Sequence, residues 1–297
     1  MTSSDTAGTF DPSAAERLTP DLVDTLRRDR DTRVLLVDGD RMPVGDAAAP
    51  ALRFVDPASI PAGAEVAFLG RDQDGSAVLL AAADRDAPQL DGARSLREFG
   101  AALPDAEAEM AVAAVALGRW LRDARHCPAC GEATLLATSG WSRHCDGCRR
   151  EHFPRTDPAV IVAPRSADGT RLLLGANAAW RGEMYSCFAG FVEAGESAER
   201  TVHRELQEET GVRLTDVQYV ESQAWPYPRS LMLGFHARVI DDAEVRPDGE
   251  EIISSRWFTR EEIGRGLRGE LDVRLPGGLS VAHRLIRVWY DAADETP

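Results

Sequence analysis

The chain has 297 residues, of which 43% are hydrophobic and 28% charged, and its 34 basic against 49 acidic residues give a formal net charge of −15. This balance disfavours sequence-independent binding to nucleic acid, which needs basic surface to displace counterions. No apolar run reaches the roughly 18 residues of a membrane-spanning helix, and the N-terminus has neither the basic start nor the apolar centre of a signal peptide, so we expect a cytoplasmic protein without a membrane partner.

The first hundred residues contain short apolar runs that are typical of strands. These runs lie at 33–37, 51–55, 65–70 and 77–83. The last two flank Asp74-Gly75, a dipeptide that favours a hairpin turn. We therefore expect an N-terminal α+β domain over residues 1–104, although no motif in it indicates a function.

An Ala-rich segment after Pro104 predicts a helix that connects this domain to a cysteine-rich segment. Apolar residues recur in it at helical spacing, namely at Met110, Ala114, Leu117 and Leu121. We place this connecting helix at 105–126.

Four of the five cysteines form two knuckles in which two residues separate each pair. They are Cys127, Cys130, Cys145 and Cys148. Two knuckles of this spacing are typical of a tetrahedral thiolate site for Zn²⁺, and a site filled by four cysteines is closed and structural. The alternatives are two disulfides, which a reducing cytosol disfavours, or a redox pair. We predict a zinc ribbon over 127–153.

The remaining chain, 154–297, reads as one further domain. Strands are expected at 159–163 and 171–175, joined by a hairpin turn at Asp168-Gly169, and again at 217–225 and 230–240. Cys187 lies in an apolar stretch and is expected to be a small buried residue rather than a nucleophile. A closing helix is predicted near the end, with an apolar face made of Val281, Leu285, Val288 and Trp289.

The stretch GFVEAGESAERTVHRELQEETGV, residues 190–212, concentrates glutamates on one predicted helix. Ser197 is suited to cap the start of this helix and Gly211 to end it. Glu205, Glu208 and Glu209 are three and four residues apart, so their carboxylates project from about one face. Such crowding is destabilising unless a cation neutralises it, and Mg²⁺ and Mn²⁺ prefer carboxylate ligands. A solvated acidic helix is the alternative.

The order of residues in this stretch resembles the signature box of the Nudix hydrolases. Gly190, Glu196, Arg204-Glu205-Leu206, Glu208-Glu209 and Gly211-Val212 match its fixed positions. The resemblance implies an α+β fold, a Nudix α/β/α sandwich with a mixed sheet, here preceded by the zinc ribbon and the N-terminal domain. It also implies metal-assisted hydrolysis of a nucleoside diphosphate derivative, with Glu205, Glu208 and Glu209 as catalytic metal ligands. Glu196 and Arg204 are then a structural ion pair.

A second stretch, SQAWPYPRS at 222–230, resembles the SQPWPFPxS array of the NADH pyrophosphatase branch of this family, with Ala224 in place of proline and Tyr227 in place of phenylalanine. Its aromatic rings and prolines are suited to hold a flat base, whereas the alternative is an aromatic turn packed on the core. The resemblance implies that the substrate is bound by Gln223, Ala224, Trp225, Pro226, Tyr227, Pro228, Arg229 and Ser230.

The branch resemblance extends to positions outside these two motifs. It implies that Phe153, Ala189 and Ala282 line the substrate site, and that the Ala189 carbonyl can join the metal shell. Glu251 best matches a further metal-binding carboxylate, with Glu250 as an alternative. The general base is left open among Glu209, Glu250 and Glu251.

Together these features predict a Nudix enzyme that splits NAD(H) into NMN(H) and AMP, using Mg²⁺ or Mn²⁺ for catalysis and Zn²⁺ for structure. The branch resemblance further implies removal of NAD caps from RNA 5′ ends and a homodimer, and Arg143, Arg149, Arg150 and Arg155 are candidates to guide an RNA tail. Two other hypotheses stay open: a Nudix hydrolase for another substrate, such as ADP-ribose or a dinucleoside polyphosphate, and a catalytically silent zinc-ribbon protein that binds nucleotide or RNA.

Overall fold

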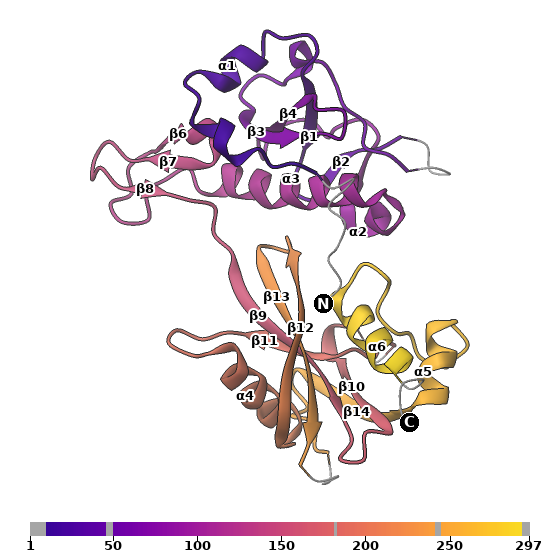
Figure 1. Ribbon diagram of the computed structural model, residues 1–297. Coiled ribbons are helices and arrows are strands. Elements are labelled where there is room, and N and C mark those ends of the chain that lie inside the picture. Colours follow the sequence, from indigo (N-terminus) through magenta and orange to yellow (C-terminus); the bar gives the residue numbers. More distant parts are fainter. Residues whose placement is uncertain (1–9, 46–49, 181–182, 241–244, 293–297) are drawn as a thin grey trace. The chain divides into compact units, whose positions relative to one another are not determined.

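The computed structural model describes residues 10–45, 50–180, 183–240 and 245–292 and divides into two compact units (Figure 1). One unit holds the chain up to Arg155 together with Pro226–Arg229, and the other holds Thr156–Trp225 and the chain from Ser230 onward. Each unit has its own buried hydrophobic clusters. Among the described residues, no helix combines the length and the apolar character needed to cross a bilayer.

A three-stranded sheet forms the centre of the N-terminal unit (Figure 1). Strand β4 (Ala77–Ala82) lies between β1 (Arg33–Val37), to which it is parallel, and β3 (Glu65–Arg71), to which it is antiparallel. All six residues of β4 are buried, because helices cover both faces of the sheet. The hairpin predicted around Asp74-Gly75 is confirmed.

Helix α3 (Asp105–Asp123) packs on one face of this sheet. Met110, Ala114, Leu117 and Leu121, the predicted apolar face, are all buried there. The other face is covered by α1 (Leu22–Leu26). The smaller elements of the unit are η1 (Ala14–Leu18), β2 (Arg41–Pro43), η2 (Pro57–Ser59), β5 (Ala93–Ser95), α2 (Leu96–Phe99) and η3 (Gly100–Ala102).

The strand predicted at 51–55 is wrong. Leu52 pairs only in an isolated bridge with Val44, and Val55 in another with Val34. The segment passes from one neighbour to another instead of following a single strand. Pro50 and Pro57 flank it, and each lacks the backbone N–H that would extend a ladder.

The ribbon after α3 is a small antiparallel sheet of β6 (Leu135–Ala137), β7 (Ser142–His144) and β8 (Glu151–His152), with η4 (Thr138–Gly140) between the first two. Arg143 on β7 is 1% exposed. Its guanidinium donates to Glu65 and to the Leu121 carbonyl, the latter at 2.7 Å. The prediction that Arg143 guides an RNA tail is therefore wrong, because its guanidinium is buried and bonded to groups within the unit.

The C-terminal unit is built on a six-stranded mixed sheet in the order β12-β13-β9-β10-β14, with β11 paired to β9 (Figure 1). Strands β13 and β9 are parallel and the other pairs antiparallel. The strands are β9 (Asp157–Arg165), β10 (Arg171–Asn177), β11 (Phe188–Phe191), β12 (Leu214–Trp225), β13 (Ser230–Val239) and β14 (Ile252–Thr259), and η5 (Ala178–Trp180) comes after β10.

Helices cover both faces of this sheet, as the predicted α/β/α sandwich requires. On β9, Val160 and Val162 belong to the cluster beneath α4 (Ala198–Thr210), whereas Ile161 and Ala163 belong to the cluster beneath α6 (Val281–Asp291). This alternation is the period of two that puts successive strand residues on opposite faces. Helix α5 (Arg260–Leu267) lies on the α6 side.

The predicted apolar face of α6 is wrong at one position. Val288 is 46% exposed, whereas Ile286 is fully buried beside Leu285 and Trp289. The face of α6 that packs on the sheet therefore includes Ala282 and Ile286 and leaves out Val288.

Candidate active site

The glutamate-rich helix is α4, and its ends form as its sequence predicts. The Ser197 hydroxyl accepts a hydrogen bond from the Arg200 backbone N–H at 3.3 Å, and Gly211 ends the helix with φ of 72°. Val202 and Leu206 are fully buried and fix the rotation of the helix on the sheet. The packing of these two residues thereby fixes the direction in which the α4 carboxylates of Glu205, Glu208 and Glu209 project.

Arg204 holds the loop before α4 against the helix. Its Nε and Nη2 donate to the two carboxylate oxygens of Glu196, at 3.0 and 2.9 Å. This two-point bond is the main cause of a Glu196 pKa lowered to about 2. The same guanidinium donates to the Phe191 carbonyl at 3.0 Å, so β11, the loop and α4 are joined through one side chain.

Arg204 also contacts two of the predicted metal ligands. Its Nη1 lies 2.9 Å from Glu205 Oε1 and 3.0 Å from Glu208 Oε2. Hydrogen bonds to Glu196, Glu208 and Glu205 raise the pKa of Arg204. The sequence predicts that a divalent cation relieves the repulsion on this face, and the structure adds a partial counter-charge from Arg204, within the motif itself.

Glu209 lies in a different environment from its neighbours. Its side chain is 3% exposed and its Oε2 has no hydrogen-bond partner among the described residues. Burial, followed by the nearby charge of Glu251, raises the pKa of Glu209 to about 9. A buried carboxylate oxygen without a donor is costly, and a divalent cation supplies the charge that is missing here. The environment of Glu209 is therefore the one expected of a metal ligand.

Glu205 is constrained by the backbone of β11. A Cβ built on Gly190 would lie 1.9 Å from its Cδ, so glycine is required for the carboxylate to approach the strand this closely. Burial is the largest cause of a raised Glu205 pKa. Ala189, the residue before, is half-buried on β11 opposite Ile161.

Glu251 immediately precedes β14, and its charge raises the pKa of both Glu209 and Glu205. The Asn177 side-chain amide points to its Oε1 at 3.5 Å. Sequence reasoning missed Asp248, which binds the backbone of this segment, because an Asp-Gly pair reads as an ordinary turn. Glu250 is exposed in the same turn.

Residues of the second motif lie mainly on strands rather than in a loop. Gln223, Ala224 and Trp225 end β12 and pair with Met232, Leu231 and Ser230 on β13. The Gln223 amide donates to the Leu279 carbonyl at 2.6 Å and accepts from the Val281 N–H at 2.8 Å. Its polar atoms thus bind the start of α6.

The turn Pro226–Arg229 belongs by its contacts to the N-terminal unit. The Tyr227 ring packs against that unit's core, and the Arg97 guanidinium lies 3.6 Å from the ring centroid. Burial raises the pKa of Tyr227 to about 12. Pro228 and Arg229 are exposed and Pro226 is buried.

The two remaining predicted substrate positions differ in exposure. Phe153 is 61% exposed just after β8, whereas Ala282 is 4% exposed in the first turn of α6. The Ala282 carbonyl accepts from the Cys187 thiol at 3.8 Å. Cys187 is buried and burial raises its pKa to about 12, which confirms that it is not placed as a nucleophile.

The four ribbon cysteines are arranged as a zinc site requires. Within the described ranges, they alone form a group of three or more candidate ligands whose donor atoms all lie within 4.8 Å of one another. The sulfurs of Cys127 and Cys148, and those of Cys130 and Cys145, are 3.5 Å apart, close to the spacing of about 3.8 Å in a tetrahedral Zn–thiolate site. The carboxylates of α4 are not drawn together this closely.

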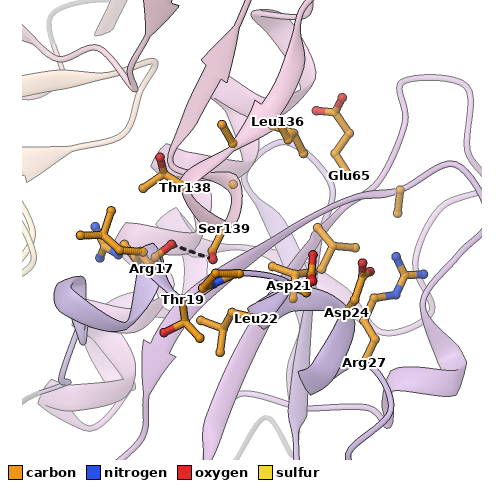
Figure 2. Close-up of a pocket in the computed structure, with 17 residues that line it drawn as sticks. Arg17, Thr19, Asp21, Leu22, Asp24, Arg27, Glu65, Leu136, Thr138 and Ser139 are labelled. Atoms are coloured by element: carbon orange, nitrogen blue, oxygen red, sulfur yellow. Dashed lines mark hydrogen bonds between the residues drawn. The ribbon is translucent and has the colours of Figure 1, made fainter.

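A pocket of about 570 Å³ lies elsewhere, in the N-terminal unit (Figure 2). It lies between η1, α1, the start of β3 and η4, and the Ser139 hydroxyl donates to the Arg17 carbonyl at 3.0 Å on one side. Acidic Asp21, Asp24 and Glu65 alternate with arginines around it. The residues that line it include none of the predicted site residues, and their mixed charge favours no particular ligand.

The mixed sheet, the capped acidic helix and the buried Glu209, whose Oε2 lacks a hydrogen-bond partner in the part of the chain that the structure describes, are the features expected of a Nudix hydrolase. Family models agree: the NUDIX domain matches residues 155–275, the NADH pyrophosphatase zinc ribbon domain 122–153, and the NADH pyrophosphatase-like rudimentary NUDIX domain 25–120. The last match gives the N-terminal domain a family that its sequence motifs did not reveal.

The chain is 41% identical over 239 residues to the NAD-capped RNA hydrolase NudC of Mycobacterium tuberculosis, covering 76% of this chain and 75% of that protein. Human NAD-capped RNA hydrolase NUDT12 is 38% identical over 63% of this chain and 42% of its own length. A Nudix hydrolase structure from Nitrosomonas europaea aligns over 57% of this chain and 92% of its own, with 21% identity and a TM-score of 0.44. The chain belongs to the Nudix hydrolases, in the group that carries the NADH pyrophosphatase zinc ribbon.

Proposed function

We propose that this enzyme hydrolyses the pyrophosphate of NAD(H) to NMN(H) and AMP, and that it also removes NAD caps from RNA 5′ ends. The observation that carries the proposal is the buried Glu209 Oε2, which has no hydrogen-bond partner among the described residues and lies near the charges of Glu251, Glu205 and Glu208. The relatives named NAD-capped RNA hydrolase support the choice of substrate. Cleavage of the free dinucleotide and of the cap breaks the same bond.

In this proposal Glu205, Glu208, Glu209 and Glu251 hold Mg²⁺ or Mn²⁺, with the Ala189 carbonyl as a further ligand. When bound, divalent ions neutralise the pyrophosphate and lower the pKa of a bound water. A bound metal would take the place of the Arg204 contacts to Glu205 and Glu208, while the two-point bond from Arg204 to Glu196 would keep the loop in place. Glu209, Glu250 and Glu251 are the candidates to accept the proton of the attacking water.

We assign substrate binding to the second motif, Gln223 to Ser230, with Phe153, Ala189 and Ala282. Trp225 is half-buried at the end of β12, and a large aromatic ring is suited to stack on a base. The remaining candidates to contact an RNA tail are the exposed Arg149, Arg150 and Arg155. We further propose a cytoplasmic homodimer whose structural Zn²⁺ is held by Cys127, Cys130, Cys145 and Cys148.

The test is a turnover assay with NADH, NAD⁺, ADP-ribose and NAD-capped RNA in the presence of Mn²⁺ or Mg²⁺. We expect AMP from NADH, a loss of at least about 100-fold in kcat for Glu208→Gln, and little change for Glu199→Gln, an exposed glutamate in the first turn of the same helix. Trp225→Ala should abolish NADH turnover selectively.

Two outcomes would contradict the proposal. Efficient ADP-ribose hydrolysis that survives Trp225→Ala would assign another Nudix specificity. Nucleotide or RNA binding without any AMP release would indicate a silent binding protein.

A further inference from the structure

Asp248 lies in the turn that precedes β14 and carries no part of the Nudix box. Its Oδ1 accepts hydrogen bonds from three consecutive backbone N–H groups, those of Glu250 at 3.1 Å, Glu251 at 3.1 Å and Ile252 at 2.9 Å. One carboxylate oxygen thereby fixes three successive peptide groups. The middle one belongs to Glu251, the carboxylate assigned to the metal.

The same turn is attached to the end of the metal-binding helix. The Asp248 N–H donates to the Glu209 carbonyl at 3.1 Å, and the Arg246 N–H donates to the Thr210 carbonyl at 2.9 Å. Carbonyls in the last turn of a helix have no partner within the helix. These two bonds therefore give the last two carbonyls of α4 a hydrogen-bond partner and attach the turn to the end of the helix. Asp248 is thus bonded to the Glu209 backbone on one side and to the Glu251 backbone on the other.

Glu251 is held from a second direction by the end of β10. The Ala178 N–H donates to the Glu251 carbonyl at 2.9 Å, next to the contact from the Asn177 amide. The negative charges of Glu251 and Asp248 both raise the pKa of Glu209. The backbone bonds of this turn to the end of α4 thus place Glu251 near the carboxylates of that helix, at the cost of mutual repulsion.

We propose that Asp248 is a positioning residue of the metal centre. By fixing the backbone of 250–252 against the end of α4, it orients Glu251 toward Glu205 and Glu209. This inference rests on the proposed function, because it assumes that these carboxylates bind a divalent cation.

The test measures Mn²⁺ affinity from the electron paramagnetic resonance signal of free Mn²⁺, together with kcat and KM for NADH. Asp248→Ala removes the acceptor, whereas Asp248→Asn keeps an amide oxygen at the same place. We expect Asp248→Ala to weaken Mn²⁺ binding and lower kcat by about 10-fold or more, as for other groups that orient metal ligands. Asp248→Asn should stay within about 3-fold of the wild type, and KM should change little in both.

Asp168 supplies a matched control. It also accepts several hydrogen bonds on one Oδ1, from the Ser166 hydroxyl and from the N–H and hydroxyl of Thr170, but it does so in the β9–β10 hairpin. Asp168→Ala therefore removes a comparable turn-forming carboxylate, and we expect it to leave Mn²⁺ affinity unchanged.

A double-mutant cycle tests whether Asp248 acts through Glu251. If it does, Asp248→Ala combined with Glu251→Gln should bind Mn²⁺ no more weakly than Glu251→Gln alone. Additive effects, equal losses in Asp248→Ala and Asp248→Asn, or a wild-type affinity in Asp248→Ala would each overturn the inference. Should Asp248→Ala not fold, Asp248→Ser, which keeps an acceptor with shorter reach, gives the same comparison with a smaller expected loss.

The failure of this inference differs from a failure of the proposed function. In the first case the wild type binds Mn²⁺ and cleaves NADH while Asp248→Ala does the same. In the second case the wild type itself neither binds Mn²⁺ nor releases AMP.

Discussion

Replacing Glu209 with glutamine should remove a pH dependence of stability from the protein without bound Mg²⁺ or Mn²⁺. The folded-state pKa of Glu209 is raised from 4.5 to about 9, mainly by burial and then by Glu251. Between these two values the folded protein holds a proton that the unfolded chain releases. Its stabilising contribution is complete below pH 4.5 and is lost as pH rises through 9.

The size of the effect is set by the shift in pKa. Between pH 4.5 and about pH 9, the free energy of unfolding falls by about 1.4 kcal/mol for each unit by which the pH rises. Between pH 6 and pH 8 the wild type should therefore lose ~2.7 kcal/mol more than Glu209→Gln, since the glutamine stays neutral at both values. Saturating Mn²⁺ should reverse the loss in the wild type, because the cation binds the ionised carboxylate.

Urea unfolding at pH 6, 7 and 8, without added Mg²⁺ or Mn²⁺ and with zinc retained, measures this difference between the two proteins. Glu199→Gln, at an exposed position of the same helix, should show the wild-type slope. If wild type and Glu209→Gln lost stability in parallel across this range, the protonated, metal-free state of Glu209 would be refuted.

Three further predictions concern residues that the structure places in specific contacts. Arg143→Ala should lower the free energy of unfolding by ~3 kcal/mol, because the buried bonds to the Glu65 carboxylate and to the Leu121 carbonyl are lost and Glu65 is left with the longer contact to Arg125, at 3.8 Å, whereas exposed Arg149→Ala should change it by less than ~0.5 kcal/mol in the same denaturant titration. Gly190→Ala should reduce kcat about 100-fold by displacing the carboxylate of Glu205, which we propose as a metal ligand, and Gly277→Ala, where a Cβ meets nothing within 4 Å, should retain full turnover. Cys145→Ser should release zinc in metal analysis and lower the Tm, since a fully buried ligand is lost; a full zinc complement would contradict the four-thiolate site.

The spacing of residues along the chain determined which side chains share a helix face, a metal knuckle or a hairpin turn. The intervals within α4 place its glutamates on one side and its apolar residues on the other, because a helix repeats every 3.6 residues wherever it packs. Each cysteine knuckle likewise brings its own two thiolates together, since it is a tight local turn, whereas the pairing of β6, β7 and β8 brings the two knuckles to each other. The hairpins at Asp74-Gly75 and Asp168-Gly169 also result from their own residues.

Only the tertiary structure decided the environment of those side chains. Glu208 is exposed and Glu209 is buried although they are adjacent, and the turn that carries Asp248 is bonded through its backbone to the Glu209 and Thr210 carbonyls. Arg143 is buried by β3 and α3, which lie far away in the chain. Burial, pairing and pKa depend on which distant segments pack on a residue, and the spacing of neighbouring residues carries no information about that.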